Sequence, residues 1–263
     1  MTIFTPDRVL AELLQAKRLW LFLDYDGTLD EFAPTPAHIL PNPEVINLIA
    51  RLTQQPRIRI AVISGRRLSQ VQALLPVPGI LLAGTYGIEL QMPDGERVNW
   101  VAHDVVRPAL EHLKPRWEQL IAGRAGFFLE DKTWALALHA RFAEEGEAEE
   151  VLDIAGEMAS RTAASGLFRV LGGHRFLEIA PATAHKGQAV NFILGRHPWP
   201  DALPVYLGDD DKDEAAFGAV KAHGGIAVLV APEPRATQAD CRLESPRHAR
   251  QWLGALSARL SPE

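Results

Sequence analysis

The amino-acid sequence predicts an α/β fold: a doubly wound, Rossmann-like core built on a parallel sheet, with an inserted α+β domain. Two observations indicate the core. Buried-looking apolar runs end in polar residues at three places along the chain, and segments with helical spacing accompany the first two. This order is typical of parallel strands covered by helices on both faces. A third observation, a change in the pattern of apolar and polar residues over residues 104–184, indicates the insertion.

The composition is that of an ordinary folded protein. The 263 residues are 47% hydrophobic and 23% charged, and their net charge of −6 argues against a nucleic-acid-binding function. The single cysteine, Cys241, has no partner for an internal disulfide, which fits a reducing compartment. Charged residues occupy the first turns, and no segment reaches the ~20 apolar residues of a membrane span. We therefore expect a cytoplasmic monomer with a small-molecule partner, no nucleic acid and no membrane.

The core elements follow in order. Thr5-Pro6-Asp7 begins the first helix, because proline is favoured in a first helical turn. The first strand covers residues 19–23 and ends at Asp24, and the second covers 58–63 and ends at Ser64. Further strands are expected over residues 80–83, 205–207 and 226–230, and helices over 45–52, 67–75, from Lys186 onward, and 247–260.

The insertion has its own pattern. A helix is expected over residues 107–122, alternating apolar and polar residues over 127–142, an acidic helix over 143–164, and two short strands within 168–179. Gly172-Gly173 is a hairpin signal between the last two strands. The sequence therefore predicts a core domain of residues 1–103 and 185–263 and an inserted domain of residues 104–184.

Polar residues at the strand ends are the candidate site. Ligands of open α/β sheets bind beyond the carboxyl ends of the strands, so Asp24, Asp26, Ser64 and Asp209 should converge. A hairpin turn is the alternative for Asp26-Gly27, but it leaves Asp24 without a role. The acidic segment 208–214 has a solvated loop as its alternative. An EF-hand is excluded there, because its sixth and twelfth positions lack the required Gly and Glu.

Several carboxylates in a partly dehydrated cleft repel one another and need a cation. Oxygen ligands favour Mg²⁺, which bridges carboxylates to a substrate phosphate, so the pattern indicates phosphoryl transfer. One carboxylate can then be the nucleophile and a second the proton donor and acceptor. Ser64-Gly65-Arg66 and Lys186-Gly187 open helices where an anion can bind. Their alternatives are a plain helix cap and a surface lysine.

These residues, in this order, resemble the haloacid-dehalogenase superfamily of aspartate-nucleophile phosphatases, and within it the trehalose-6-phosphate phosphatases nearly end to end. The resemblance is carried by the following segments: Asp24-Tyr25-Asp26-Gly27-Thr28-Leu29, Ile63-Ser64-Gly65-Arg66, Leu129-Glu130-Asp131-Lys132, Ala137-Leu138-His139-Ala140-Arg141, Glu178-Ile179-Ala180-Pro181, Leu207-Gly208-Asp209-Asp210 with Asp213-Glu214, and Ala236-Thr237-Gln238-Ala239.

The resemblance implies a magnesium-dependent phosphoric monoester hydrolase that converts trehalose 6-phosphate to trehalose and phosphate in trehalose biosynthesis. It implies that Asp24 attacks phosphorus to form an aspartyl phosphate, and that Asp26 protonates the leaving oxygen and then activates water. Asp24, the Asp26 carbonyl and Asp209 would hold Mg²⁺, and Ser64 and Lys186 the phosphoryl oxygens.

The resemblance also implies that the insertion is a cap over the disaccharide. Glu130, Lys132, Arg141 and Glu178 would contact sugar hydroxyls, since charged donors and acceptors can bind several hydroxyls at once. Arg66 of the core would bind substrate as well. The alternative for each of the four residues of the insertion is a solvated surface charge.

Three residues depart from the family pattern. Tyr86 stands where the family usually has His, Lys212 replaces a usual Thr, and His174 stands where a cap Lys is expected. His174 is expected to contact substrate, with a surface histidine of the hairpin as the alternative. His139, in an alternating strand, is expected to be structural. The functional alternatives are a phosphatase for another sugar phosphate and a catalytically silent regulator, which would lack Asp24 or Asp26.

Overall fold

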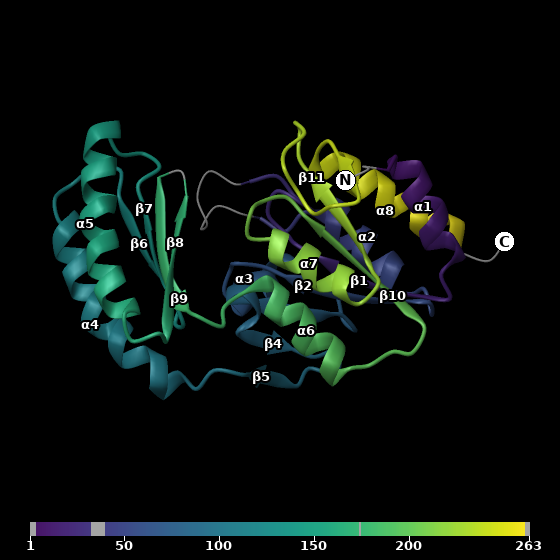
Figure 1. The fold of residues 1–263 in the computed structure, drawn as a ribbon, viewed down its shortest axis with the longest axis horizontal. Helices are drawn as coiled ribbons and strands as arrows, with labels where there is room; N and C mark the ends of the chain where they lie inside the picture. The colour runs from purple at the N-terminus through teal and green to yellow at the C-terminus, as the bar shows by residue number, and fades with distance from the viewer. Residues whose placement is uncertain (1–3, 33–39, 174, 261–263) are drawn as a thin grey trace. The chain divides into compact units, whose positions relative to one another are not determined.

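The computed structural model describes residues 4–32, 40–173 and 175–260. The chain divides into two compact units. Unit 1 consists of Met1–Val98 and His185–Glu263, and unit 2 of Asn99–Ala184 (Figure 1). Unit 2 thus begins a few residues before the boundary expected at residue 104, because a short strand and a connecting segment lead into its first helix.

Unit 1 contains an eight-stranded sheet in the order β12-β11-β10-β1-β2-β3-β4-β5. The strands from β12 to β3 are parallel, and β4 pairs antiparallel with β3. The strands are β1 (Arg18–Leu23), β2 (Ile58–Ile63), β3 (Leu81–Gly84), β4 (Glu89–Gln91), β5 (Arg97–Asn99, which reaches the unit boundary), β10 (Ala202–Gly208), β11 (Ile226–Val230) and β12 (Cys241–Leu243).

Helices cover both faces of this sheet. The helices are α1 (Pro6–Gln15), α2 (Pro43–Thr53), α3 (Leu68–Leu74), α6 (Lys186–Arg196), α7 (Glu214–Ala222) and α8 (Pro246–Leu260), with a 3₁₀ turn, η2 (Thr85–Gly87). Strand β1 shows how the chain makes two cores. Leu19, Leu21 and Leu23 pack with α1, α2, α3 and α8, whereas Trp20 and Phe22 point to α6 and α7. This alternation is what a strand buried on both faces requires.

Unit 2 is an antiparallel sheet in the order β6-β7-β9-β8, with two helices against it (Figure 1). Its elements are α4 (His103–Ile121), β6 (Phe128–Asp131), β7 (Leu136–His139), α5 (Glu145–Ala163), β8 (Phe168–Gly173) and β9 (Phe176–Pro181). Leu136 and Leu138 of β7 are fully buried on the helix side, as is Trp117 of α4. The opposite side of the sheet carries the polar residues singled out above.

The predicted fold class is confirmed. The expected strands and helices of the core are present, and the alternating stretch of residues 127–142 contains two strands, β6 and β7. The short strands β4, β5 and β12 were not predicted. Among the described residues, no helix is long and apolar enough to cross a membrane.

Candidate active site

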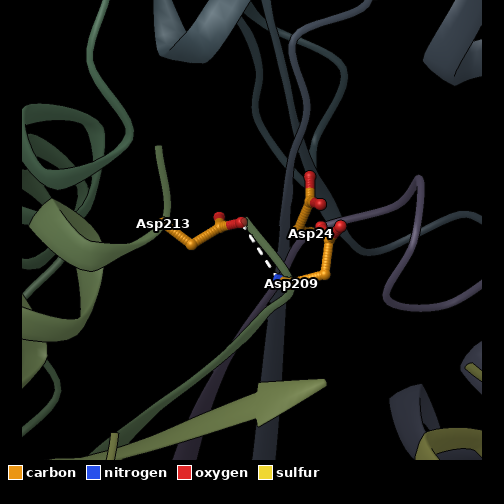
Figure 2. Close-up of side chains that lie close together, drawn as sticks. All are labelled: Asp24, Asp209 and Asp213. Atoms are coloured by element: carbon orange, nitrogen blue, oxygen red, sulfur yellow. Dashed lines mark hydrogen bonds between the residues drawn. The ribbon is translucent and has the colours of Figure 1, made fainter. Parts of the chain in front are cut away.

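Three carboxylates from two neighbouring strands and a helix start lie together in unit 1. Asp24 directly follows β1, Asp209 directly follows β10, and Asp213 precedes α7. Because β1 and β10 are parallel neighbours, their carboxyl ends meet at one edge of the sheet. One oxygen of each carboxylate lies within 4.8 Å of the others (Figure 2). The predicted convergence of Asp24 and Asp209 is therefore present.

Lys186, the first residue of α6, binds two of these carboxylates. Its Nζ lies 2.8 Å from Asp24 Oδ1 and 2.7 Å from Asp213 Oδ1. Burial acts to lower the pKa of Lys186, but the charges of Asp213 and Asp24 outweigh it and raise that pKa well above its ordinary value. The lysine is buried, so the surface alternative does not hold.

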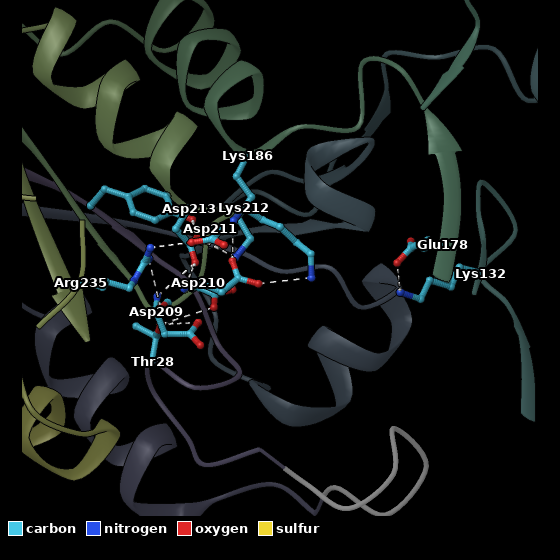
Figure 3. Close-up of polar contacts among 12 residues, drawn as sticks. Thr28, Lys132, Glu178, Lys186, Asp209, Asp210, Asp211, Lys212, Asp213 and Arg235 are labelled. Carbon is cyan, nitrogen blue, oxygen red and sulfur yellow. Dashed lines mark hydrogen bonds and ion pairs between the residues drawn. The ribbon is translucent and has the colours of Figure 1, made fainter. Parts of the chain in front are cut away.

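Asp213 organises the loop beside it. Its Oδ1 accepts hydrogen bonds from Lys186 Nζ and from the Tyr206 hydroxyl, both at 2.7 Å. Its Oδ2 accepts hydrogen bonds from the backbone N–H groups of Asp209 and Asp210, at 3.1 and 3.2 Å. Four donors fill the acceptor positions of one carboxylate. Asp213 therefore fixes both Lys186 and the backbone on which Asp209 stands (Figure 3).

Two glycines permit the close approach of these loops. Gly27 has φ +79°, and a Cβ there would collide with the carboxylate of Asp209. A Cβ on Gly208 would collide with the side chain of Asp213. Between the two loops, the Thr28 hydroxyl lies 3.4 Å from Asp24 Oδ2 and 3.5 Å from Asp209 Oδ1. The segment after β1 is not a hairpin, since it leads through α2 to the parallel strand β2.

The carboxylate cluster has the properties of a cation site. Burial, together with the charges of Asp213 and Asp209, raises the pKa of Asp24 well above its ordinary value, although Lys186 acts in the opposite direction. Burial and the charge of Asp213 raise the pKa of Asp209 to about 7. Burial is the largest cause of both raised pKa values, and the ionised carboxylates also repel one another without full compensation. A divalent cation would supply it, and an all-oxygen donor set suits Mg²⁺.

The carboxylate of Asp26 is paired with an arginine. Arg66 Nε lies 2.6 Å from Asp26 Oδ2, and Arg66 Nη2 lies 2.7 Å from Asp26 Oδ1. This is a bidentate pair, which fixes both the distance and the plane of the carboxylate. Arg66 was expected to bind substrate, and the structure places its guanidinium on Asp26.

The Ser64 loop differs from the expected helix start. The helix α3 begins at Leu68 and has seven residues, so Ser64 lies in the preceding loop and is not its cap. The buried Ser64 hydroxyl accepts a hydrogen bond from the backbone N–H of Arg66 at 3.2 Å. Tyr86 packs on this loop, since a Cβ on Gly65 would come within 2.8 Å of its ring. Tyr86 has φ +57° and is buried, which makes this a strained position.

The acidic segment after β10 is a loop with internal contacts and one exposed carboxylate, Asp211. Lys212 Nζ lies 3.3 Å from Asp210 Oδ2, and the backbone N–H of Lys212 donates to Asp210 Oδ1 at 2.8 Å. Arg235 binds the other side, with Nη1 2.6 Å from Asp211 Oδ1 and Nη2 3.3 Å from Glu214 Oε1 (Figure 3). The buried carboxylate of Asp213 shows that the segment is not solvated throughout, whereas Asp211 is solvated.

In unit 2, three of the candidate sugar-binding residues are buried on the sheet face opposite the helices. Lys132 Nζ lies 3.0 Å from Glu178 Oε2 (Figure 3). Glu130 Oε2 lies 3.2 Å from His139 Nε2. Burial excludes the solvated-charge alternative for Glu130, Lys132 and Glu178. Arg141 is exposed in the turn after β7.

His174 lies outside the described residues.

Sequence reasoning missed several partners at the site. It did not identify Tyr206, Thr28 or Arg235, and it left the role of Asp213 open. Tyr206 sits inside an apolar run, where nothing in the pattern separates a packing tyrosine from one that donates a hydrogen bond. The strand period does place it on the same face of β10 as α7, and this is the signal that could have linked it to Asp213.

Comparison with known proteins identifies the family. The model of the trehalose-phosphatase family matches residues 22–247. The trehalose-phosphate phosphatase of Mycobacterium marinum is 32% identical over 258 residues, covering 94% of this chain and 64% of that protein. The chain thus spans somewhat less than two thirds of the length of that relative. A probable trehalose-phosphate phosphatase of Sinorhizobium fredii is 32% identical over 238 residues, covering 90% of this chain and 87% of that protein.

Solved structures share the fold. The C-terminal domain of the C. albicans trehalose-6-phosphate phosphatase superposes with a TM-score of 0.86 and 22% identity, covering 98% of both chains. The sequence match over residues 22–247 contains every carboxylate of the cluster, together with Lys186, Ser64 and the residues on the unit 2 sheet. On this sequence match, the chain belongs to the trehalose-phosphatase family.

Proposed function

We propose that this protein is a magnesium-dependent phosphatase that hydrolyses trehalose 6-phosphate to trehalose and phosphate through an aspartyl phosphate. The observation that carries the proposal is the surroundings of Asp24. Its buried carboxylate lies 2.8 Å from Lys186 Nζ, next to Asp209, in a chain of the trehalose-phosphatase family. A lysine in this position favours the ionised form of the carboxylate against the effect of burial and also attracts a phosphate, so Asp24 is suited to attack phosphorus.

In the proposed first step, an oxygen of Asp24 forms a bond to phosphorus while the bond between phosphorus and the sugar oxygen breaks. Asp26 gives its proton to that oxygen. In the second step, a water oxygen bonds to phosphorus, the bond between Asp24 and phosphorus breaks, and Asp26 takes the proton of the water. Arg66 binds both oxygens of Asp26. The guanidinium occupies two of the four acceptor positions of this carboxylate, and the remaining positions are where Asp26 can carry a proton to the substrate.

The residues proposed to hold Mg²⁺ are Asp24 and Asp209 through their carboxylates and Asp26 through its carbonyl. Bound there, the ion would offset the mutual repulsion of the carboxylates and their repulsion of the phosphate dianion. Asp213 is close enough to be a ligand, but its oxygens already accept four hydrogen bonds. We propose that Asp213 positions Lys186 and the Asp209 loop and does not touch the ion.

We propose that Ser64 and Lys186 hold the phosphoryl oxygens, and that unit 2 is the cap that selects the sugar. Charged side chains on one face of its sheet, Glu130, Lys132 and Glu178, support this role, because such groups can bind sugar hydroxyls. Arg66, Arg141 and His174 complete the proposed substrate-binding set. A small-molecule partner and a cytoplasmic location are part of the proposal, supported by the net charge of −6 and a single cysteine.

The test is phosphate release from a panel of sugar phosphates, with Mg²⁺ and with a chelator. We expect trehalose 6-phosphate to have the highest kcat/KM and the chelator to stop the reaction. Preference for another sugar phosphate would support the alternative substrate. No release from any compound of the panel would support a silent regulator.

A further inference from the structure

Three rings form a row across the sheet of unit 2. Phe128 of β6, His139 of β7 and Phe176 of β9 are register partners on neighbouring strands, so their side chains point to the same face. The ring centroids of Phe128 and His139 are 5.6 Å apart with the planes 28° from parallel, and those of His139 and Phe176 are 5.3 Å apart. His139 is therefore held between two phenyl rings, which restrict the rotation of its imidazole.

The next row on the same face carries two carboxylates. Glu130 of β6 and Glu178 of β9 flank Ala137 of β7, again as register partners. Glu178 is fully buried and Glu130 is 9% exposed. Buried carboxylates require hydrogen-bond donors or cations. Each has a donor at hydrogen-bond distance: Lys132 Nζ lies 3.0 Å from Glu178 Oε2, and His139 Nε2 lies 3.2 Å from Glu130 Oε2.

We propose that His139 is a positioning residue for substrate recognition, which fixes the carboxylate of Glu130 in the orientation that binds a sugar hydroxyl. The phenyl rings hold the imidazole, and the imidazole donates from Nε2 to Glu130. The inference rests on the proposed function, because it assigns Glu130 to the sugar. It also replaces the expectation that His139 is only structural.

The contacts of His139 distinguish a positioning role from a packing role. A packing residue between two phenyl rings needs only an aromatic ring, whereas the contact to Glu130 needs a donor at one atom of that ring. A carboxylate that is free to rotate would lose part of its contact with a hydroxyl, since binding groups must be held close to the productive geometry. His139 therefore supplies two separable properties, the ring and the N–H.

Two variants of the full chain isolate these properties. His139→Phe keeps a ring between the phenyl groups and removes the donor, and His139→Gln keeps a donor and removes the ring. We expect His139→Phe to raise KM for trehalose 6-phosphate about tenfold, which is the effect of one hydrogen bond to a charged group. We expect kcat to change less, because the contact is remote from phosphorus. His139→Gln should recover most of the loss.

A sugar-free substrate and a double-mutant cycle exclude a structural effect. The ratio of kcat/KM for trehalose 6-phosphate to that for p-nitrophenyl phosphate should fall in His139→Phe. In a Glu130→Gln background, the same substitution should change KM less than twofold, because its partner is already gone. His112→Phe is the matched control, since His112 is an exposed residue of α4. Thermal unfolding of each variant shows whether the fold is intact.

The outcomes distinguish the inference from the function on which it rests. If trehalose 6-phosphate is hydrolysed and His139→Phe has the wild-type KM, or lowers kcat/KM equally for both substrates, the positioning role is wrong. Additive effects of His139→Phe and Glu130→Gln also overturn it. If another sugar phosphate is preferred, the proposed substrate is wrong, and coupling measured on that compound decides the role of His139. A protein that hydrolyses p-nitrophenyl phosphate and no sugar phosphate overturns both.

Discussion

Asp24 and Asp26 are two residues apart and have different surroundings. Asp24 is buried beside Asp209 and is bound by Lys186. The single positive charge of this lysine is shared among several carboxylates and compensates them only in part. Asp26 is half-buried and has an arginine to itself. Carboxylates in separate environments can take separate roles in one reaction. The environments thus support Asp24 as the nucleophile and Asp26 as the group that exchanges protons.

The two roles can be separated by the leaving group. Asp24→Asn should abolish phosphate release from every substrate, because an amide is a poor nucleophile. Asp26→Asn should lower kcat for trehalose 6-phosphate by about 10²–10⁴-fold, the usual size of general acid–base catalysis. Its effect on the release of p-nitrophenolate in a single turnover should be much smaller, since that leaving group needs no proton. Rapid-mixing measurements of p-nitrophenolate and phosphate on both variants test this.

Circular dichroism and thermal unfolding serve as controls that both variants are folded. If Asp26→Asn lowered the rate equally for trehalose 6-phosphate and for p-nitrophenyl phosphate, the result would contradict a proton-donor role. Phosphate release by Asp24→Asn above a trace would contradict the covalent step.

At the scale of residues, the sequence predicted which residues lie at the site better than it predicted which side chains bind one another. Asp24, Ser64 and Asp209 could be found because the end of a parallel strand is visible as the end of an apolar run. That Arg66 binds Asp26 could not be found, because the pair joins two loops 40 residues apart in the chain. The carboxylate that an arginine binds depends on the tertiary structure. The pattern of apolar and polar residues along the chain carries no information on it.

A helix-to-strand ion pair organises unit 2. Arg107 of α4 holds both oxygens of Asp131 at the end of β6, at 2.7 and 2.8 Å, and Lys114 Nζ adds a third contact at 3.0 Å. The backbone N–H of Thr133 also donates to Asp131, at 2.9 Å. The hydrogen bond from Arg107 is the largest of these effects, which together lower the pKa of Asp131 well below its ordinary value.

Asp131→Asn should therefore destabilise the protein by about 2 kcal/mol at pH 7, as expected for charge-assisted hydrogen bonds. The folded pKa of Asp131 is lowered. The stabilisation is thus fully present above the unfolded pKa near 3.9 and is lost as pH falls toward the folded pKa. Urea unfolding of wild type and Asp131→Asn between pH 7 and pH 2.5 measures the difference.

The difference between the two proteins should be constant from pH 7 to about pH 5 and then shrink. Other acidic groups titrate in both proteins and cancel in the comparison. A difference that grows as pH falls would contradict the assignment, and Glu111→Gln, on the exposed partner of Arg107, is a suitable control.

At the scale of elements, the long periodic segments were predictable and the short ones were not. β4, β5 and β12 have three residues each, too few to show alternation. The stretch of residues 127–142 was expected to be one alternating segment, yet the chain reverses at Thr133, which has φ +70°. Threonine is an uncommon residue at positive φ, and the Asp131 carboxylate that accepts its N–H supports the turn. The sequence contains Asp131 but does not indicate that its carboxylate stabilises a turn at Thr133.

At the scale of the molecule, the proposed Mg²⁺ site predicts that the stability of the protein depends on the ion. Mg²⁺ that binds the folded cluster and not the unfolded chain should stabilise the protein by about 2.7 kcal/mol at a hundred times its Kd. We expect a rise of several degrees in Tm, which EDTA should reverse together with activity. Differential scanning fluorimetry against Mg²⁺ concentration measures it. Asp209→Asn should reduce the rise, and Asp94→Asn, an exposed control, should not. Zn²⁺ support of activity with Mg²⁺ inert would contradict the proposed ion.

The chain crosses between the two units twice, at residues 98–99 and 184–185. We predict a change in the placement of the two units during the reaction. The proposed reaction requires one, because substrate must enter and water must then be limited while the aspartyl phosphate exists. We expect the radius of gyration from small-angle X-ray scattering to fall when trehalose and magnesium fluoride, a mimic of the transferred phosphoryl group, are added together. Magnesium fluoride with Asp24→Asn serves as the control, since the group that the mimic would meet is changed. Identical scattering profiles with and without the mimic, in a preparation shown to hydrolyse trehalose 6-phosphate and to be inhibited by it, would contradict closure. In that case the exclusion of water would depend on unit 1 alone.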